Sequence, residues 1–336
     1  MREIFQHIKR RLDAGEDLIL ATVTASTGST PRSSGARMLV GRDGRICGTV
    51  GGGSAEYQSE QYARALLGRQ SHGQKDFAMT STDAEQAGMI CGGGLSVYFH
   101  YIPAGDAYTR ALADAAEAYY AADTALWLFL PFGGRPSLYA RADGFVGEPC
   151  PESLLEKLPR MSKTAEAGGS TYHVEQINDP GRVYIFGCGH VGQQLEPVLT
   201  RVGFRCTVLD DRPDFADPAL FPTAEAVKCN DFARIDDAVS IGPEDYVCVT
   251  TRGHLYDLIV QAQVLKKHPC YVGVVGSRRK AAAVGRALVE KYGITPGELA
   301  LVTTPVGLEI AAETPAEIAV SIAAQMIAHR AARRRG

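Results

Sequence analysis

Residues 183–195 read "VYIFGCGHVGQQL", an apolar run followed by a glycine-rich turn and the start of a helix-like segment. Gly187, Gly189 and Gly192 have the spacing GxGxxG. In dinucleotide-binding folds the first glycine permits a tight turn, the second lets a pyrophosphate approach, and the third lets helix and strand pack closely. A helix that begins near His190 would point its free amides at an anion. The stretch therefore predicts a phosphate-binding strand–turn–helix unit.

The second half of the chain alternates strand and helix patterns around this unit. The predicted strands are "RVYIFG", "RCTVLDD", "AVKCN", "DYVCVTT" and "CYVGVVG", and helices are expected at about 190–203, 254–267 and 277–292. Continuous apolar strands that alternate with helices indicate a doubly wound parallel sheet of the Rossmann type. Asp210 closes the second strand 23 residues after Gly187, where dinucleotide-binding folds place an acid for the ribose. A last helix is predicted from Pro315, with Thr314 as N-cap and Glu317 completing a capping box.

The first half mixes strands and helices in the manner of an α+β domain. Strands are expected at 18–26, 44–53, 95–102, 125–132 and 171–177, and helices at 54–67, 105–122 and 151–159. The breaker cluster "NDPGR" at 178–182 marks the boundary. We therefore predict an α/β chain with an α+β domain over residues 1–177 and a Rossmann-like domain over 178–336.

Composition restricts the class of protein. The chain has 336 residues and a formal net charge of −3, so it has no general affinity for nucleic acid or a membrane surface. No stretch approaches the roughly 18 apolar residues of a membrane span. Eight cysteines occur without a CxxC pair, which fits a reduced, cytoplasmic compartment. A homodimer is the default expectation for the assembly.

Further polar residues follow two later strands of the predicted sheet. Thr251 and His254 follow the fourth strand, and Ser277 and Arg278 follow the fifth. Ligands of such sheets bind outside the carboxyl ends of the strands, so these residues are candidate ligand contacts. The competing interpretation is that the glycine turn serves packing alone and that the charges form a solvated run.

The first half carries glycine runs beside an unusual thiol. Gly51, Gly52 and Gly53 precede a predicted helix that starts at Ser54, and such a turn can form an anion-binding nest. Arg32 and Arg37 can supply bidentate partners for an oxyanion. Cys91, in "MICGGG", lies in a glycine-rich loop where a thiolate can serve as a soft metal ligand. The competing interpretation of Cys91 is a buried, inert thiol.

Seven segments together resemble the XdhC/CoxI family, the accessory proteins of xanthine dehydrogenase and related molybdenum hydroxylases. They are "ATVTASTGSTPRSSGARMLVGRDGRICGTVGGGSAE", "CGGGLSVYF", "VYIFGCGHVG", "VLDDRP", "TTRGHLYD", "YVGVVGSRRK" and "TPVGLEIAAETPAEIAVSIAAQM". The resemblance implies a non-catalytic chaperone rather than an enzyme. Such a protein binds molybdenum cofactor, as molybdopterin or its dinucleotide, protects it during sulfuration, and delivers it to an apo-hydroxylase. It also implies a cysteine desulfurase as the sulfur donor.

One position departs from the family pattern. Ser54 stands where family members commonly have cysteine; if that cysteine holds the metal or accepts sulfur, this chain either relies on Cys91 or binds the cofactor differently. A phosphate or pyrophosphate of the cofactor would bind at the Gly187–Gly192 turn, and the pterin near Arg32 and the glycines at 51–53. We expect the site to lie between the two domains.

Two other functions remain open on the sequence. An NAD(P)-dependent oxidoreductase would use Asp210 for the ribose and His254 as acid or base. A nucleotidyl transferase or nucleotide sensor would need a carboxylate cluster for magnesium, for which Asp210 and Asp211 alone are thin support.

Overall fold

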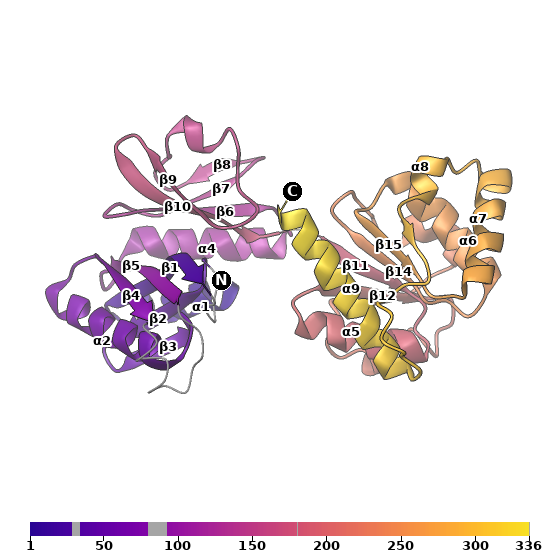
Figure 1. Cartoon of the computed structure of the whole chain (residues 1–336), viewed down its shortest axis with the longest axis horizontal. Helices are drawn as coiled ribbons and strands as arrows, with labels where there is room; N and C mark the ends of the chain where they lie inside the picture. Colours follow the sequence, from indigo (N-terminus) through magenta and orange to yellow (C-terminus); the bar gives the residue numbers. More distant parts are fainter. Residues whose placement is uncertain (29–33, 80–92, 180, 336) are drawn as a thin grey trace. The chain divides into compact units, whose positions relative to one another are not determined.

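The chain divides into two compact units, Met1–Asp179 and Pro180–Gly336. The computed structural model describes residues 1–28, 34–79, 93–179 and 181–335 (Figure 1). Two predicted site residues, Arg32 and Cys91, lie outside these ranges. In the described part of the chain, no helix is long and apolar enough to span a membrane. The predicted fold class is confirmed: an α+β unit precedes a unit with a doubly wound parallel sheet.

The first unit contains two antiparallel sheets of five strands each. The first sheet has the order β3-β2-β1-β5-β4, and its strands are β1 (Leu18–Gly28), β2 (Arg37–Gly41), β3 (Gly44–Gly48), β4 (Gly73–Met79) and β5 (Gly93–Ile102). The second has the order β8-β7-β6-β10-β9, and its strands are β6 (Leu126–Pro131), β7 (Ser137–Ala140), β8 (Gly144–Val146), β9 (Lys163–Ala167) and β10 (Ser170–Asn178). The register of β1 against β5 pairs Leu18 with Ile102.

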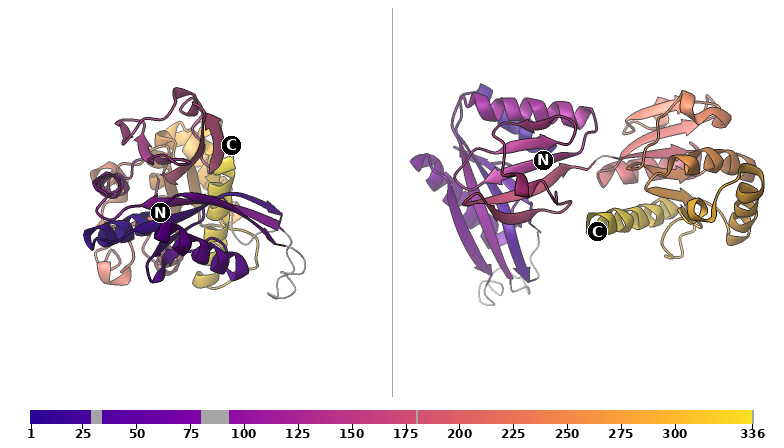
Figure 2. Two further views of the ribbon diagram at one scale, coloured as in Figure 1. Left: turned by 90° about the vertical axis from the view of Figure 1, so that its left-hand side faces the viewer. Right: turned by 90° about the horizontal axis from the view of Figure 1, so that it is seen from above.

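Three helices complete this unit: α1 (Arg2–Asp13), α2 (Gly53–Arg69) and α4 (Ala107–Ala121). Helices α1 and α4 share one hydrophobic core with residues of both sheets, so they lie between the sheets (Figures 1 and 2). Helix α2 packs on the first sheet through a separate core. The helix predicted at 151–159 was wrong, since only the 3₁₀ turn Glu152–Leu154 (η1) forms there. Pro151 and Pro159 bracket the stretch, and so short a segment does not support an α-helix.

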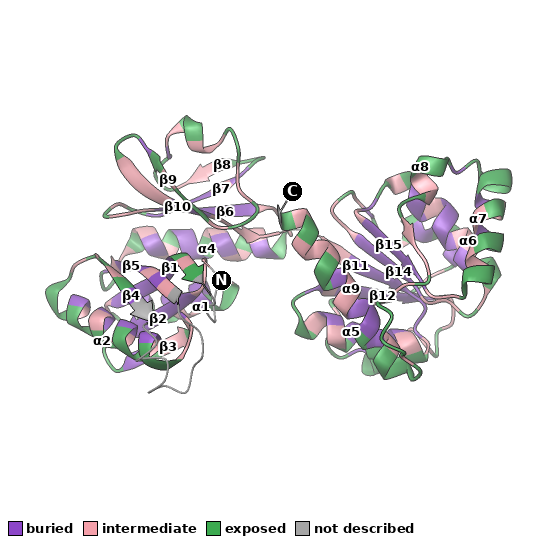
Figure 3. Cartoon of the chain, in the orientation of Figure 1, coloured by how far each residue is buried: buried purple, intermediate pink, exposed green. Residues whose placement is uncertain are grey.

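The second unit is built on one parallel sheet of six strands in the order β13-β12-β11-β14-β15-β16. The strands are β11 (Arg182–Phe186), β12 (Arg205–Asp210), β13 (Ala226–Cys229), β14 (Tyr246–Val249), β15 (Tyr271–Val274) and β16 (Val302–Thr303). The central strands are buried on both faces (Figure 3). Chain order reverses between β11 and β14, and such a switch point is where open α/β sheets bind their ligands.

Helices cover both faces of this sheet. Its helical segments are α5 (His190–Arg201), η2 (Pro218–Leu220), η3 (Phe232–Asp237), α6 (His254–Val264), η4 (Leu265–Lys267), α7 (Arg278–Tyr292), α8 (Pro296–Leu299) and α9 (Pro315–Arg335). Helices α5 and α9 share one core, while η3, α6 and α7 share the other. The predicted capping box of α9 is present: the Glu317 amide donates to Thr314 Oγ1, and Glu317 Oε2 accepts from the Thr314 amide.

Candidate functional site

Two glycines of the fingerprint are required by backbone packing. Gly187 has φ +114°, and a Cβ there would lie 2.5 Å from the carbonyl oxygen of Thr250. A Cβ on Gly192 would lie closer than 3.0 Å to the Gly187 carbonyl oxygen. Both neighbours are backbone atoms, which cannot turn aside as a flexible side chain can. These glycines therefore let β11, β14 and α5 approach one another at the switch point.

Backbone packing does not require a glycine at position 189. Its φ of −72° suits any residue, and a Cβ there would meet nothing within 4 Å. Gly189 is also the N-cap of α5, and no side chain caps that helix start. Among the described residues, the first-turn amides, which begin at the exposed His190, therefore have no side-chain acceptor. Open space above uncapped amides suits an anion that must approach the backbone closely.

The neighbouring helix start repeats this arrangement. Gly253 is the N-cap of α6, again without a side-chain cap, and a Cβ there would meet nothing within 4 Å. His254 begins the helix and is exposed. Since β11 and β14 are adjacent parallel strands, both helix starts lie at the same edge of the sheet. Thr250 links the two loops, because its hydroxyl donates to the Gly187 carbonyl at 2.8 Å.

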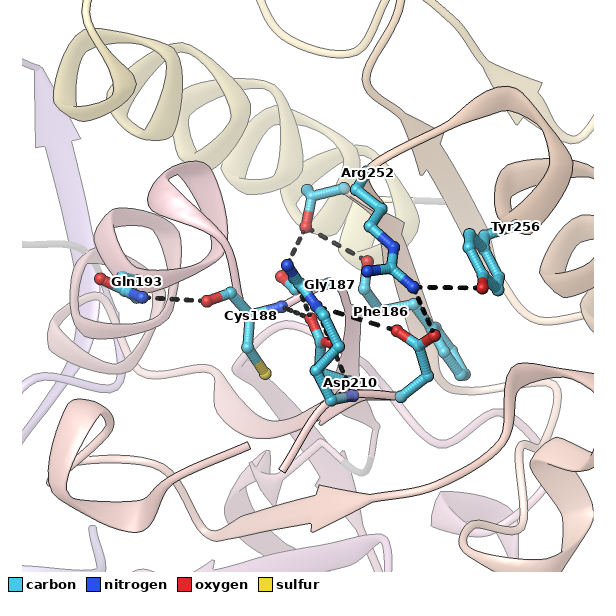
Figure 4. A network of polar contacts seen from close by, with 10 residues as sticks. Phe186, Gly187, Cys188, Gln193, Asp210, Arg252 and Tyr256 are labelled. Atoms are coloured by element: carbon cyan, nitrogen blue, oxygen red, sulfur yellow. Dashed lines mark hydrogen bonds and ion pairs between the residues drawn. The ribbon is translucent and has the colours of Figure 1, made fainter. Parts of the chain in front are cut away.

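The carboxylate of Asp210 accepts hydrogen bonds from other groups of the protein (Figure 4). It is 1% exposed. Its Oδ1 accepts from the Arg212 amide at 3.1 Å and from Arg212 Nε at 2.8 Å. Its Oδ2 accepts from the Cys188 amide at 2.8 Å and from Arg212 Nη2 at 3.0 Å. A carboxylate offers about four lone-pair positions, so these bonds use its full capacity and leave none for a ribose hydroxyl.

Electrostatics agree with that geometry. Burial alone would raise the pKa of Asp210, but the hydrogen bonds from Arg212 and the Cys188 amide outweigh burial and lower it. The carboxylate is therefore charged at neutral pH, and its hydrogen bond from the Cys188 amide holds the fingerprint loop in place. Burial also raises the pKa of the Cys188 thiol to about 12, and the Asp210 charge adds to the effect. Cys188 is thus an inert thiol at physiological pH.

Arg252 extends the polar network across the carboxyl edge of the sheet. Its Nη2 donates to Asp211 Oδ2 at 3.0 Å and to the Tyr256 hydroxyl at 3.1 Å (Figure 4). The side chain is 48% exposed, so it remains open to solvent. Tyr256 was not predicted as a site residue, and Asp211 was named only as a possible magnesium ligand. The sequence signal for the pairing was slight: an arginine in the "TTRGH" loop and a second aspartate after β12.

The other predicted rim residues have structural partners. Thr251 donates to Asp257 Oδ1 at 2.5 Å, and Ser277 caps α7 by accepting from the Lys280 amide. Arg278 pairs with Glu309 on the surface, where both side chains are largely exposed. All three residues lie after β14 or β15, at the edge that also carries the glycine loop.

A partly buried ion pair lies beside these residues. Asp257 is buried at the start of α6 and pairs with Lys280 in the first turn of α7. Lys280 lines two hollows in the surface of this unit. One, of about 600 Å³, is largely apolar and lies along α7 toward α8. The other, of about 420 Å³, is lined by His254, Ser277 and Arg279 as well. The smaller hollow has His254, Arg279 and Lys280 in its lining, and Lys280 is already paired with Asp257.

In the first unit, amides of the glycine run at 51–53 already donate hydrogen bonds to side chains of the protein. Gly51, Gly52 and Gly53 have φ values of +149°, +82° and +61°, which explains three glycines in sequence. The Gly51 amide donates to Thr49 Oγ1 at 3.1 Å, and the Gly52 amide donates to Glu56 Oε2 at 3.2 Å. The predicted nest therefore already holds a carboxylate, that of Glu56. The Ser54 hydroxyl accepts from Gln58 at 2.9 Å.

The predicted metal ligand remains a prediction, because Cys91 lies outside the described residues. Within residues 1–28, 34–79, 93–179 and 181–335, no three His, Cys, Asp or Glu side chains gather as a metal site.

Comparison with known proteins assigns the family. The XdhC Rossmann domain description matches residues 183–326, and the XdhC and CoxI family description matches residues 11–78. A Bacillus subtilis protein, named as a probable subunit of xanthine dehydrogenase, is 25% identical over 323 residues, covering 95% of both chains. The uncharacterized Escherichia coli protein YqeB is 26% identical over 313 residues, which are 92% of this chain but only 42% of YqeB.

A solved structure agrees over nearly the whole length. A Bacillus halodurans crystal structure described as a xanthine dehydrogenase superposes with a TM-score of 0.79 at 25% identity, covering 98% of this chain and 96% of that one. The two family descriptions fall on the two units in the expected order. The chain belongs to the XdhC and CoxI family.

Proposed function

We propose that this protein is an accessory factor that binds molybdenum cofactor, protects it during sulfuration, and delivers it to a xanthine dehydrogenase-type hydroxylase. The proposal rests on the uncapped start of α5 at Gly189, which we call the phosphate cradle. Beside it, Asp210 has no acceptor left for a ribose hydroxyl. Gly189 leaves uncapped amides open to an anion, while all four acceptor positions of Asp210 are occupied. The residues fit the phosphate end of such a cofactor better than the adenosine end of a dinucleotide coenzyme.

The family supports the same direction, since two relatives carry xanthine dehydrogenase in their names. We therefore propose the apo-hydroxylase as the acceptor and a cysteine desulfurase as the sulfur donor. When bound, the cofactor would supply the molybdenum centre of the hydroxylase. This chain's own role would be to hold the phosphate until transfer.

An NAD(P)-dependent oxidoreductase is the alternative. Ribose binding at Asp210 would require the Arg212 guanidinium to leave the carboxylate, at the loss of two charge-assisted hydrogen bonds. Charged hydrogen bonds contribute about 1.5–3 kcal/mol each. That loss would have to be recovered from the coenzyme, so we expect nicotinamide coenzymes to bind weakly.

The deciding experiment is cofactor retention. The purified protein is incubated with released molybdenum cofactor, and separately with NADH and NADPH, before gel filtration. Pterin fluorescence and molybdenum that elute with the protein support the proposal. Tight nicotinamide binding without pterin retention would replace it with the oxidoreductase alternative.

Gly189→Ser tests the cradle itself. Its Cβ enters open space, and a serine N-cap hydroxyl accepts from first-turn amides. The variant should therefore fold normally and yet lose pterin retention at least tenfold. Gly297→Ser on α8 is the matched control, since a Cβ there meets only Thr295 Oγ1 at 3.9 Å. Equal retention by both variants would remove the α5 start from the site.

Cys91→Ala addresses the metal end. We expect it to lower molybdenum retention while pterin retention changes less. Unchanged molybdenum retention would exclude that thiol as a ligand.

A further inference from the structure

Helix α9 carries apolar residues on its outer face as well as on its buried face. The residues that it adds to the core shared with α5 are Ala319, Ile322, Ala323 and Met326. Away from that core, Val320 is 51% exposed and Ile327 is 38% exposed. A surface helix normally turns charged and polar residues to solvent, and a helix that is apolar all round is normally covered. The outer face of α9 therefore has the character of a contact surface.

Val320 and Ile327 belong to a longer apolar row, which we call the outer stripe of α9. The stripe consists of Ala316, Val320, Ala324, Ile327 and Ala331, all of them exposed or partly exposed (Figure 3). Steps of three and four residues keep these side chains on one face of a helix. At a rise of 1.5 Å per residue the stripe is about 22 Å long. Three of its five members are alanines, and small side chains at a contact let two helices approach closely.

The segment before the helix widens this surface. Leu308 is 45% exposed and Ile310 is 50% exposed. Leu308 is held against α9, because its amide donates to the Ser321 carbonyl at 3.3 Å and its carbonyl accepts from the Ser321 hydroxyl at 2.6 Å. A single exposed apolar residue is ordinary, but a contiguous group of them marks a site of interaction.

The charges of α9 are confined to its two ends. The first turn carries Glu317, and the last two turns carry Arg330, Arg333 and Arg334. No Asp, Glu, Lys or Arg lies between Glu317 and Arg330. Burial lowers the pKa of His329, so this ring adds no charge at neutral pH. The stripe can therefore contact an identical stripe without repulsion between like charges.

The order of residues along the helix favours an antiparallel contact between two copies. If Val320 of one copy faces Ile327 of the other, the same register sets Ala316 opposite Ala331 and Glu317 opposite Arg330. Each of these pairs occurs twice about a two-fold axis. A parallel contact would instead set Glu317 against Glu317 and Arg330 against Arg330, which is unfavourable.

The end charges act without new bonds. Glu317 Oε2 accepts from the Thr314 amide, and Arg330 donates to the Val202 carbonyl. Both side chains can keep these bonds in the pair, because charges attract over the Debye length of about 8 Å. The apolar residues and the charges thus agree on one register and one direction.

We propose that two copies of this chain associate through α9, antiparallel, with outer stripe against outer stripe. A two-fold contact of this kind uses the same surface on both copies and closes at a dimer. A helix pair is smaller than the roughly 800 Å² per partner of a standard interface, so we expect a dimer that dissociates in the micromolar range. The inference concerns assembly and does not depend on what binds at the phosphate cradle.

Sedimentation of the full-length chain tests the assembly first. Equilibrium runs from nanomolar to high micromolar protein should show a monomer that passes to a dimer and no further. A monomer at every concentration would overturn the proposal, whether the first unit or another protein covers the stripe. Assembly that continues beyond two copies would also overturn it, because a two-fold contact closes.

Paired charges test the register. Val320→Lys and Ile327→Glu, each made alone, should weaken dimerisation at least tenfold, because each places a charge against an apolar residue. The double variant should recover at least part of the affinity, since every lysine at 320 then faces a glutamate at 327 of the other copy. Within one helix these positions are seven residues apart and do not contact each other. A double variant weaker than both single variants would refute the antiparallel register.

Val289→Lys on α7 is the matched control, since Val289 is a helical valine of the same unit and is 44% exposed. It should dimerise like the parent. Equal affinities for Val289→Lys and Val320→Lys would place the interface elsewhere and overturn the proposal. Circular dichroism checks that each variant folds. If Val320→Lys does not fold, the comparison of Ile327→Glu with Val289→Lys decides in the same way.

Discussion

Replacing Gly192 by alanine should destabilise the second unit strongly, whereas the same change at Gly189 should not. At Gly192 the new Cβ would lie closer than 3.0 Å to the Gly187 carbonyl oxygen and 3.2 Å from the carbonyl carbon. Overpacking typically costs about 1–3 kcal/mol, and a clash with backbone belongs at the upper end. One kcal/mol shifts Tm by roughly 2–4 °C in a unit of this size. We therefore expect Gly192→Ala to lower Tm by roughly 6–12 °C.

Gly189→Ala is the matched control because it adds the same methyl group to the same turn, but in open space. Alanine is a poorer N-cap than glycine, and the cost is below about 1 kcal/mol, or less than about 4 °C. Calorimetry of both full-length variants measures the difference. If the Tm of Gly192→Ala is as high as that of Gly189→Ala, the close approach of α5 to the β11 loop is wrong. If Gly189→Ala melts as low as Gly192→Ala, the space above α5 is not open.

Three further predictions concern other parts of the chain. Asp210→Asn should lower the free energy of unfolding by about 2–3 kcal/mol at pH 7. Removing one partner of a fully buried ion pair costs about 3–5 kcal/mol, and the cost is smaller here because Arg212 keeps some exposure. Because the folded pKa of Asp210 is lowered, this stabilisation is complete above the ordinary value near 3.9 and is lost as the pH falls through the folded pKa. Urea unfolding at pH 7 and pH 3 should therefore show a smaller gap between variant and parent in acid; a constant gap would contradict the assignment. Among the described cysteines, a disulfide reagent at pH 8 should label the exposed Cys229 before the buried Cys188 and Cys206, whose thiol pKa values burial raises to about 12; peptide mapping that found Cys188 modified first would argue against a closed fingerprint loop. Thr314→Ala should lower the unfolding free energy by about 1 kcal/mol, because it removes the N-cap of α9, and denaturant titration that found no change would mean that the box does not stabilise the helix.

The sequence predicted elements whose pattern is local. The apolar strands of the second unit and the capping box before α9 are both read from a few consecutive residues. Strand β9, "KTAEA", was missed because alanine, lysine and glutamate have low strand propensity. It forms because β10 pairs with it along the register from Ser170–Ala167 to Val174–Lys163. Gly168 and Gly169, both with positive φ, form the two-residue turn between these strands, and this Gly-Gly pair was the available local sign of a hairpin.

The site shows the same division. Spacing predicted that Asp210 would close β12 near the fingerprint, and it does. Spacing could not reveal that Arg212, two residues on, would bind both carboxylate oxygens. The glycines at 51–53 were interpreted as a nest for a ligand, yet Glu56 satisfies one of their amides. An acid in the first turn of α2 was the available sign. A motif predicts where backbone donors will lie, but only the full set of hydrogen bonds tells which remain free.

The free amide donors at the starts of α5 and α6 are consistent with the proposed function, in which the protein gives up its ligand. The amides of α5 and α6 begin at Gly189 and Gly253, which are only partly buried, and both helices start at exposed histidines. The nearby guanidinium of Arg252 is already paired with Asp211. An anion here would gain amide hydrogen bonds and the helix dipole, worth about 0.3–1 kcal/mol at exposed sites, without a buried counter-charge that departure would strand. Removing one partner from a buried pair costs about 3–5 kcal/mol, so a site without such a pair lowers the barrier to release. An anion bound in this way would be released readily, which is what the proposed delivery to an acceptor requires.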